Sequence, residues 1–300
     1  MFNESLYAHG LIGLRQVSPW VRPADWPALP TSTSNEIDIL AAVFNESSNY
    51  VALQATVSSG TYTVNWGDGS APQTYTSGTT ASYQYSYSAS GLGPLTAEGY
   101  KTAPIKVTPT TGGATITGFN SGVANSSISV AAGNPYLDMQ INAPNLTSLT
   151  ISSSSWPCGV LRHILITAIG AITSLYNTFF NCYSLQSITF PSGSLASVTT
   201  LTNAFAYCYS LRYISFPTGA LGLVNTTTSA FLSCVALARI INCAIPISFS
   251  VASCNLSAAA LNEIYTALPT VTAQTITRTG NVGAGSDTPS IATAKGWVVV

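Results

Sequence analysis

The chain has 300 residues, of which 46% are hydrophobic and only 6% are charged. Such a composition favours buried β-structure and argues against intrinsic disorder, which needs high charge and low hydrophobicity. The formal net charge of -1 gives no long-range attraction to a phosphate backbone or an anionic lipid, so we expect neither a nucleic-acid partner nor a membrane-surface partner. The most apolar stretch, 159–180, holds Arg162 and His163 and is interrupted by Ser, Thr and Asn, so we expect no membrane insertion.

Residues 1–36 form the first segment, where the sequence predicts an extended arm. The segment holds four prolines and two tryptophans, Trp20 and Trp26, and shows little periodicity. Proline fixes φ and donates no backbone hydrogen bond, so the arm should lie against the body of the protein or against a neighbouring subunit. We take Trp20 and Trp26 as the candidate assembly contacts. The first residues lack the basic start and apolar run of a secretory signal, so synthesis without export is expected.

Residues 37–110 predict a small β-sandwich, because short β-type runs such as 49–57 and 61–66 alternate with Gly and Ser turns. The run YTVNWGDGS at 62–70 resembles the turn motif of polycystic-kidney-disease (PKD) domains, and KVTP at 106–109 resembles the closing strand of that family. Trp66 is expected in the core. Asp68 is interpreted as a turn residue, with a calcium ligand as the alternative, since no second carboxylate lies near it in sequence.

A run of alternating tyrosines at 83–87 should share one face of a strand. We expect that face to pack on Trp20, on Trp26 or on a neighbouring subunit. Residues 111–144 are expected to be a connecting β segment.

Residues 145–254 contain a repeat of 26 residues, which decides the predicted fold. The run LYNTFFNCYSLQSITFP at 175–191 aligns without gaps to LTNAFAYCYSLRYISFP at 201–217. A third copy keeps the frame from Phe231 to Ile240, and two weaker copies precede these at 146–151 and 161–166. Five coils are therefore expected.

The repeat resembles the leucine-rich repeats of the bacterial surface-antigen (BspA-like) type, which implies a solenoid whose coils bury their Leu, Ile and Phe against one another. Cys182, Cys208 and Cys234 should then form a buried column. The alternatives are disulfides between coils or a thiolate metal site, although the sequence has no CxxC pair. Residues 255–300 predict a small α/β cap, with a helix at 257–268, strands at 275–277 and 297–300, and a short helix near 291–295.

Catalytic chemistry is not expected. No Asp or Glu stands between Asp138 and Glu263, so the solenoid has no carboxylate pair for glycoside hydrolysis. A Ser-His-Asp triad would need His9 or His163, and no nucleophile elbow, Walker loop or dinucleotide motif is present. No cofactor or metal is expected.

The outward residues of the solenoid strands are the candidate binding residues, because the alternate Leu, Ile and Phe point inward. Two outward rows are predicted: Ser148, His163, Ser187, Tyr213 and Arg239; and Thr150, Leu165, Thr189, Ser215 and Ile241. His163, Ser187, Tyr213 and Arg239 are the hypothetical contacts to a ligand or partner. A solvated face without a ligand is the alternative.

The combination of an arm, a PKD-like sandwich and a capped leucine-rich solenoid is similar to bacteriophage virion proteins. That resemblance implies a mainly β, non-enzymatic protein of the particle surface, either a capsid decoration or a tail or fibre component. The expected partners are other virion proteins, further copies of the chain, and a host-surface glycan or protein. A bacterial surface adhesin and a carbohydrate-active enzyme are the alternatives.

Overall fold

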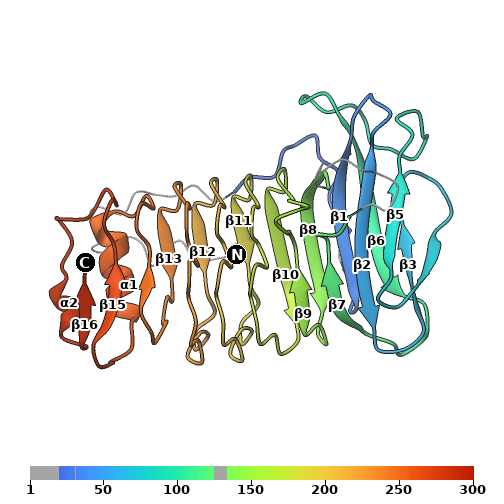
Figure 1. Cartoon of the computed structure of the whole chain (residues 1–300). Coiled ribbons are helices and arrows are strands. Elements are labelled where there is room, and N and C mark those ends of the chain that lie inside the picture. The colour runs from blue at the N-terminus through green and yellow to red at the C-terminus, as the bar shows by residue number, and fades with distance from the viewer. Residues whose placement is uncertain (1–19, 31, 125–133) are drawn as a thin grey trace, which may run out of the picture.

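The computed structural model describes residues 20–30, 32–124 and 134–300, and the fold is mainly β with a small helical end (Figure 1). Two sheets packed face to face lie at one end, and a solenoid of about seven turns runs from them toward the short helices near the C-terminus. The first 19 residues of the expected arm, with His9, lie outside the described residues.

One sheet of nine strands runs through both halves of the molecule. Its solenoid part is parallel, and the part from β8 through β1 to β4 is antiparallel. In spatial order the strands are β13 (Arg239–Ile241), β12 (Tyr213–Ser215), β11 (Ser187–Thr189), β10 (His163–Ile169), β8 (Tyr136–Ala143), β1 (Glu36–Val43), β6 (Lys101–Pro109), β3 (Thr61–Asn65) and β4 (Gln73–Thr76). We call this the long sheet. Because β8 and β1 are hydrogen bonded, the solenoid and the N-terminal part share one continuous sheet.

A second sheet of four strands packs on the antiparallel part. It consists of β5 (Thr80–Gln84), β2 (Tyr50–Val57), β7 (Ile116–Asn120) and β9 (Ser148–Thr150). Trp66, Tyr62 and Tyr136 fill the space between the sheets and are fully buried. The Tyr136 hydroxyl crosses the gap and donates to the carbonyl of Ala52 at 2.8 Å, which satisfies its buried polar group. The expected burial of Trp66 is confirmed.

The tyrosines of the run at 83–87 pack against the core of the protein. The expected contact of that face with Trp20 or Trp26 is therefore wrong. Tyr83 stacks on Trp66 with ring centroids 5.0 Å apart, and the Tyr85 hydroxyl donates to the Trp66 carbonyl at 2.8 Å. The strand β5 belongs to the second sheet, whose inner face looks at the core, whereas the arm covers the other side of the long sheet.

Asp68 lies in the turn that the glycines around it make possible, with φ of +76° at Gly67 and +88° at Gly69. One carboxylate oxygen accepts from the backbone N–H of Ser70 at 3.0 Å and from its hydroxyl at 2.6 Å. The other oxygen accepts from the Tyr83 hydroxyl at 2.7 Å. These contacts are those of a turn-stabilising Asp, as expected.

The three coils that carry β11, β12 and β13 each contribute one short strand to the long sheet and stack a phenylalanine ring on that of the neighbouring coil. Phe179, Phe205 and Phe231 form a continuous buried stack, with centroid distances of 5.2 and 5.8 Å. On the opposite side of the coils, Ser174, Thr200 and Thr226 form isolated parallel bridges. A single core cluster runs from the sandwich through the coils to the cap, so burial between neighbouring units stabilises the whole chain.

All six cysteines are buried free thiols, which confirms the expected column of Cys182, Cys208 and Cys234. The thiol of Cys208 donates to the carbonyl of Phe179 at 3.2 Å, and that of Cys234 to the carbonyl of Phe205 at 3.1 Å. Each thiol therefore satisfies a carbonyl of the preceding coil as well as filling the core.

The first coils differ from the expectation. The segments at 146–151 and 161–166 are not two successive coils, because β9 pairs with β7 in the second sheet while β10 pairs with β8 in the long sheet. They begin only 15 residues apart, which is too short for a complete turn of 26. Ser148 and Thr150 consequently lie outside the two predicted rows, and Asp138 of β8 is the residue beside His163.

The C-terminal cap follows the prediction closely. The helix α1 (Ala258–Ala267) begins at Ser257, whose hydroxyl accepts from the N–H of Ala260 at 3.2 Å. A three-stranded parallel sheet completes this end: β14 (Phe249–Ser250) comes before α1, and β15 (Gln274–Thr277) and β16 (Trp297–Val299) come after it, with α2 (Ser290–Thr293) between them. Among the described residues, neither helix has the length and apolar character that crossing a bilayer requires.

Candidate functional site

The predicted outward row exists as a row of neighbours in the long sheet. His163 pairs with Ser187, Ser187 with Tyr213, and Tyr213 with Arg239 in consecutive parallel registers. Each is half-buried, whereas the residue that follows it in its strand is buried. The period-2 alternation of strands therefore places these four side chains on the outer face, as the repeat predicts.

The N-terminal arm covers one end of this row. Trp20 stacks on the imidazole of His163 with centroids 4.2 Å apart and an interplanar angle of 5°. Arg22 forms an ion pair with Asp138, and Asp138 is 2.8 Å from Nδ1 of His163. The side chain of Asp138 is only 3% exposed, so the carboxylate joins the arm to the sheet away from solvent.

His163 is uncharged at neutral pH in this setting. Burial beneath Trp20, together with the nearby guanidinium of Arg22, lowers the pKa of His163 from 6.5 to about 4. A neutral ring both stacks on the indole and bonds to Asp138. In the described residues, His163 thus serves as an attachment point for the arm.

Trp26 anchors the arm a few residues further along. It is 5% exposed and packs with Leu40 and Leu137 in a small apolar cluster on the outer face of the long sheet. Its indole N–H donates to the hydroxyl of Tyr100 at 3.0 Å, which satisfies the buried donor. The expectation that the arm lies against its own body or a neighbour is met, for residues 20–30, by the protein's own sheet. The arm is not extended throughout, because the N–H of Trp26 donates to the carbonyl of Pro23 at 3.1 Å and closes a turn.

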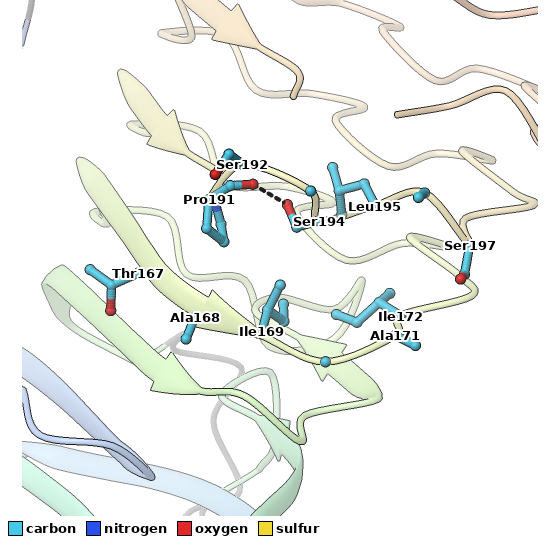
Figure 2. Close-up of a pocket in the computed structure, with 13 residues that line it drawn as sticks. Thr167, Ala168, Ile169, Ala171, Ile172, Pro191, Ser192, Ser194, Leu195 and Ser197 are labelled. Atoms are coloured by element: carbon cyan, nitrogen blue, oxygen red, sulfur yellow. Dashed lines mark hydrogen bonds between the residues drawn. The ribbon is translucent and has the colours of Figure 1, made fainter. Parts of the chain in front are cut away.

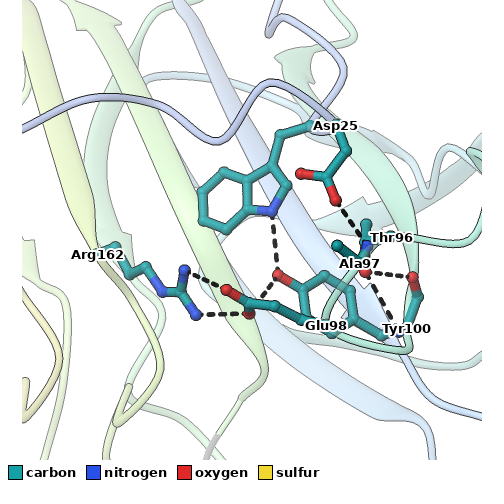
Figure 3. Close-up of polar contacts among 7 residues, drawn as sticks. Asp25, Thr96, Ala97, Glu98, Tyr100 and Arg162 are labelled. Carbon is teal, nitrogen blue, oxygen red and sulfur yellow. Dashed lines mark hydrogen bonds and ion pairs between the residues drawn. The ribbon is translucent and has the colours of Figure 1, made fainter.

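A polar network surrounds Trp26 (Figure 3). The guanidinium of Arg162 donates two hydrogen bonds to Glu98, at 2.8 and 2.6 Å, and Glu98 also accepts from the Tyr100 hydroxyl at 3.0 Å. The carboxylate of Asp25 accepts from the backbone N–H of Ala97 at 2.7 Å. The guanidinium of Arg162 lies 5.3 Å from the ring centre of Trp26, so cation–π attraction adds to the apolar contact.

Arg239 is engaged at the other end of the row. Its guanidinium donates to both carboxylate oxygens of Glu263 in α1, at 2.7 and 2.8 Å. This bidentate pair fastens the cap to β13. Of the four candidate residues, Ser187 and Tyr213 lie between the two anchored ends, and the groups they present to solvent are hydroxyls.

A hollow of about 460 Å³ lies between two coils on another edge of the solenoid (Figure 2). It arises because the coil between Cys158 and Cys182 is two residues shorter than the next, so the turn at 191–197 extends beyond the turn at 167–172. Small, hydroxyl-bearing and aliphatic residues line it, among them Ile169, Ile172 and Leu195. The hydroxyl of Ser194 donates to the carbonyl of Pro191 at 2.8 Å. None of the described residues that line it has a titratable side chain.

Sequence reasoning missed the acids and cations that hold the arm. Arg22, Glu98, Asp138 and Arg162 lie in four separate segments, and no local spacing links them. Within the described ranges, no group of three His, Cys, Asp or Glu side chains is arranged to hold a metal ion. Comparisons of the chain with protein-family models, with curated proteins and with solved structures find no match.

Proposed function

We propose that the chain is a non-enzymatic structural protein on the surface of a bacteriophage particle, as a capsid decoration or a tail or fibre component. In this role it contributes to assembly and to attachment of the particle to the host surface. We also propose that residues 62–70 are part of a PKD-like domain and that the 26-residue repeat is a BspA-like leucine-rich repeat, because their sequences resemble those families.

The observation that carries the proposal is the long sheet. Nine hydrogen-bonded strands extend from the sandwich end through the stacked coils, and the core beneath them is continuous. Such a structure holds its two ends at a fixed separation, because bending it would break sheet hydrogen bonds and ring stacking together. A protein that displays one end away from a particle needs this rigidity.

The charged groups of the described residues support a scaffold role. Asp138 binds the guanidinium of Arg22 in the arm, and Glu263 of the cap binds that of Arg239. Glu98 binds the guanidinium of Arg162, which lies beside Trp26 of the arm. These ion pairs therefore hold the arm and the cap in place on the long sheet. The proposed partners are other virion proteins, further copies of the chain, and a glycan or protein of the host surface.

The decisive experiment locates the chain in purified particles by mass spectrometry and fits the structure into the electron density of the particle. Density with one end of the rod attached to capsid or tail and the other exposed supports the proposal. Recovery of the chain from the bacterial envelope but not from particles overturns it in favour of an adhesin. Release of sugars from host polysaccharide by the purified protein overturns its non-enzymatic part.

A further inference from the structure

An exposed strip of large apolar side chains follows the solenoid along the turns that carry the buried cysteines. In three successive coils these turns place such residues at equivalent positions on the surface. Tyr183, Tyr209 and Val235 each directly follow a cysteine and are 37%, 43% and 55% exposed. We define the aromatic strip as Phe180, Tyr183, Tyr207, Tyr209, Leu232 and Val235.

The rings of the strip contact one another across the coils. Tyr183 and Tyr209 stack with centroids 5.5 Å apart and an interplanar angle of 16°. Tyr207 meets Tyr209 edge-on at 6.1 Å and Phe180 edge-on at 5.5 Å. These contacts fix the ring positions before any ligand arrives, and preformed aromatic surface binds at low entropic cost.

Tyr207 occupies a backbone position that disfavours a bulky residue. Its φ is +64°, and the equivalent positions in the neighbouring coils hold Asn181 at +62° and Ser233 at +61°. Asn tolerates this left-handed conformation, whereas a large side chain there is strained. The same left-handed angle occurs at the buried Leu195 and Leu221, at +65° and +68°, so it reflects the turn geometry of the coils, and Tyr207 adapts to that geometry at a cost in backbone strain.

The chemistry around the strip suits an uncharged partner rich in hydroxyl groups. From residue 164 to residue 262 the only charged side chains are Arg212 and Arg239, and Arg239 is paired with Glu263. The half-buried Ser184, Gln186 and Ser210 and the exposed Arg212 follow the tyrosines in sequence. They offer hydrogen bonds beside the rings, whereas a charged partner would find little complementary charge.

We infer that the aromatic strip is a binding site for a neutral glycan chain, with the exposed parts of the Tyr183 and Tyr209 rings as its apolar contacts and the flanking hydroxyl, amide and guanidinium groups as hydrogen-bond partners. This inference deepens the proposed function, since a host-surface ligand is part of it. The site differs from the outward row of Ser187 and Tyr213, which lies on the face of the long sheet.

The test measures retardation of the purified full-length protein in native gels that contain dextran, soluble starch or galactomannan. We expect retardation by at least one polysaccharide, and a loss of affinity of about tenfold in Tyr183→Ala and in Tyr209→Ala. Tyr207→Asn should raise the Tm by about 2 °C, because it relieves backbone strain, and should also weaken binding. Tyr176→Ala is the matched control, because that tyrosine is 57% exposed and, among the described residues, shares no ring contact with the strip.

Three results would overturn the inference. The first is no retardation by any of the three polysaccharides, and the second is binding that survives the strip variants but is lost in Tyr213→Ala. The third is a change of oligomeric state in the strip variants, which would make the strip a protein interface. Because these assays need no particle, they can fail while the chain is still found in virions, and can succeed if it is not.

Discussion

The outer face of the long sheet has two halves, one covered by the described residues of the arm and one not, although the strands of both halves are similar. Over β1, β8 and β10, Trp20 of the arm stacks on the half-buried His163, and Trp26 and Asp138 are buried. Arg22 of the arm pairs with Asp138 there. Over β11 and β12, no described residue of the arm lies on the row, and Ser187 and Tyr213 present hydroxyls. Side chains in the same row of the sheet thus lie in two different environments. Whether the arm covers a side chain determines whether it holds the arm or faces solvent.

The largest expected effect comes from removing the carboxylate beneath the arm. Asp138→Ala leaves Arg22 and His163 without their shared partner, and breaking a buried pair costs about 3 kcal/mol of unfolding free energy. Chemical denaturation followed by tryptophan fluorescence should show this loss, with Trp20 and Trp26 becoming more solvent-exposed.

Ser187→Ala is the matched control, because Ser187 is the other sheet neighbour of His163. A change within about 0.5 kcal/mol is expected there, as for other substitutions away from buried networks. Equal losses in Asp138→Ala and Ser187→Ala would show that the two halves of the face do not differ as described.

The second largest effect is expected from acid, which should lower the free energy of unfolding through His163 beneath the arm. The pKa of His163 is about 4 in the folded protein and 6.5 ordinarily, so the unfolded chain takes up the proton first. Stability therefore falls as the pH drops from about 6.5 to about 4, by up to about 3 kcal/mol from this group.

Comparison with His163→Gln isolates that contribution from other titrating groups. The stability difference between pH 7 and pH 4.5 should be smaller in the variant than in the unaltered protein. In Trp20→Ala the pKa of His163 should rise toward its ordinary value, which nuclear magnetic resonance of the imidazole would measure. Identical pH profiles for all three proteins would contradict the assigned burial.

The smallest effect is expected at the other end of the row. Glu263→Gln removes the charge that Arg239 binds, but both side chains are partly exposed, at 29% and 17%. A loss of about 0.5 kcal/mol is expected, and added salt should reduce it. A loss as large as that of Asp138→Ala would mean that the cap is held mainly through this ion pair.

The repeat spacing predicted much of this geometry. Because residues 26 apart occupy equivalent places in successive coils, the alignment alone placed Ser187, Tyr213 and Arg239 side by side. It failed at Ser148, where a short apolar pattern resembled a coil but belongs to the opposite sheet. The pattern reports which residues are apolar, and does not report which sheet receives the strand.

The arm shows the limit more clearly. Its prolines predicted an extended segment, yet its site on the sheet depends on partners far away in sequence, such as Tyr100 for Trp26, 74 residues on. No local signal encodes such contacts, since they form only when the whole sheet is assembled. The aromatic strip was equally hidden, because its Tyr residues follow the repeat pattern and only the structure shows that they are exposed.

The buried cysteines make it possible to measure where along the solenoid the coils separate first. Burial raises the pKa of Cys158 and Cys254 to about 12, so alkylating reagents should reach a thiol only when its coil separates from the next. Five of the buried thiols are spread from the first coils to the cap, at Cys158, Cys182, Cys208, Cys234 and Cys254. The labelling rate of each cysteine would therefore report how often its own coil separates from the next. The order of those rates would show whether the rod unzips from its capped end or from the sandwich.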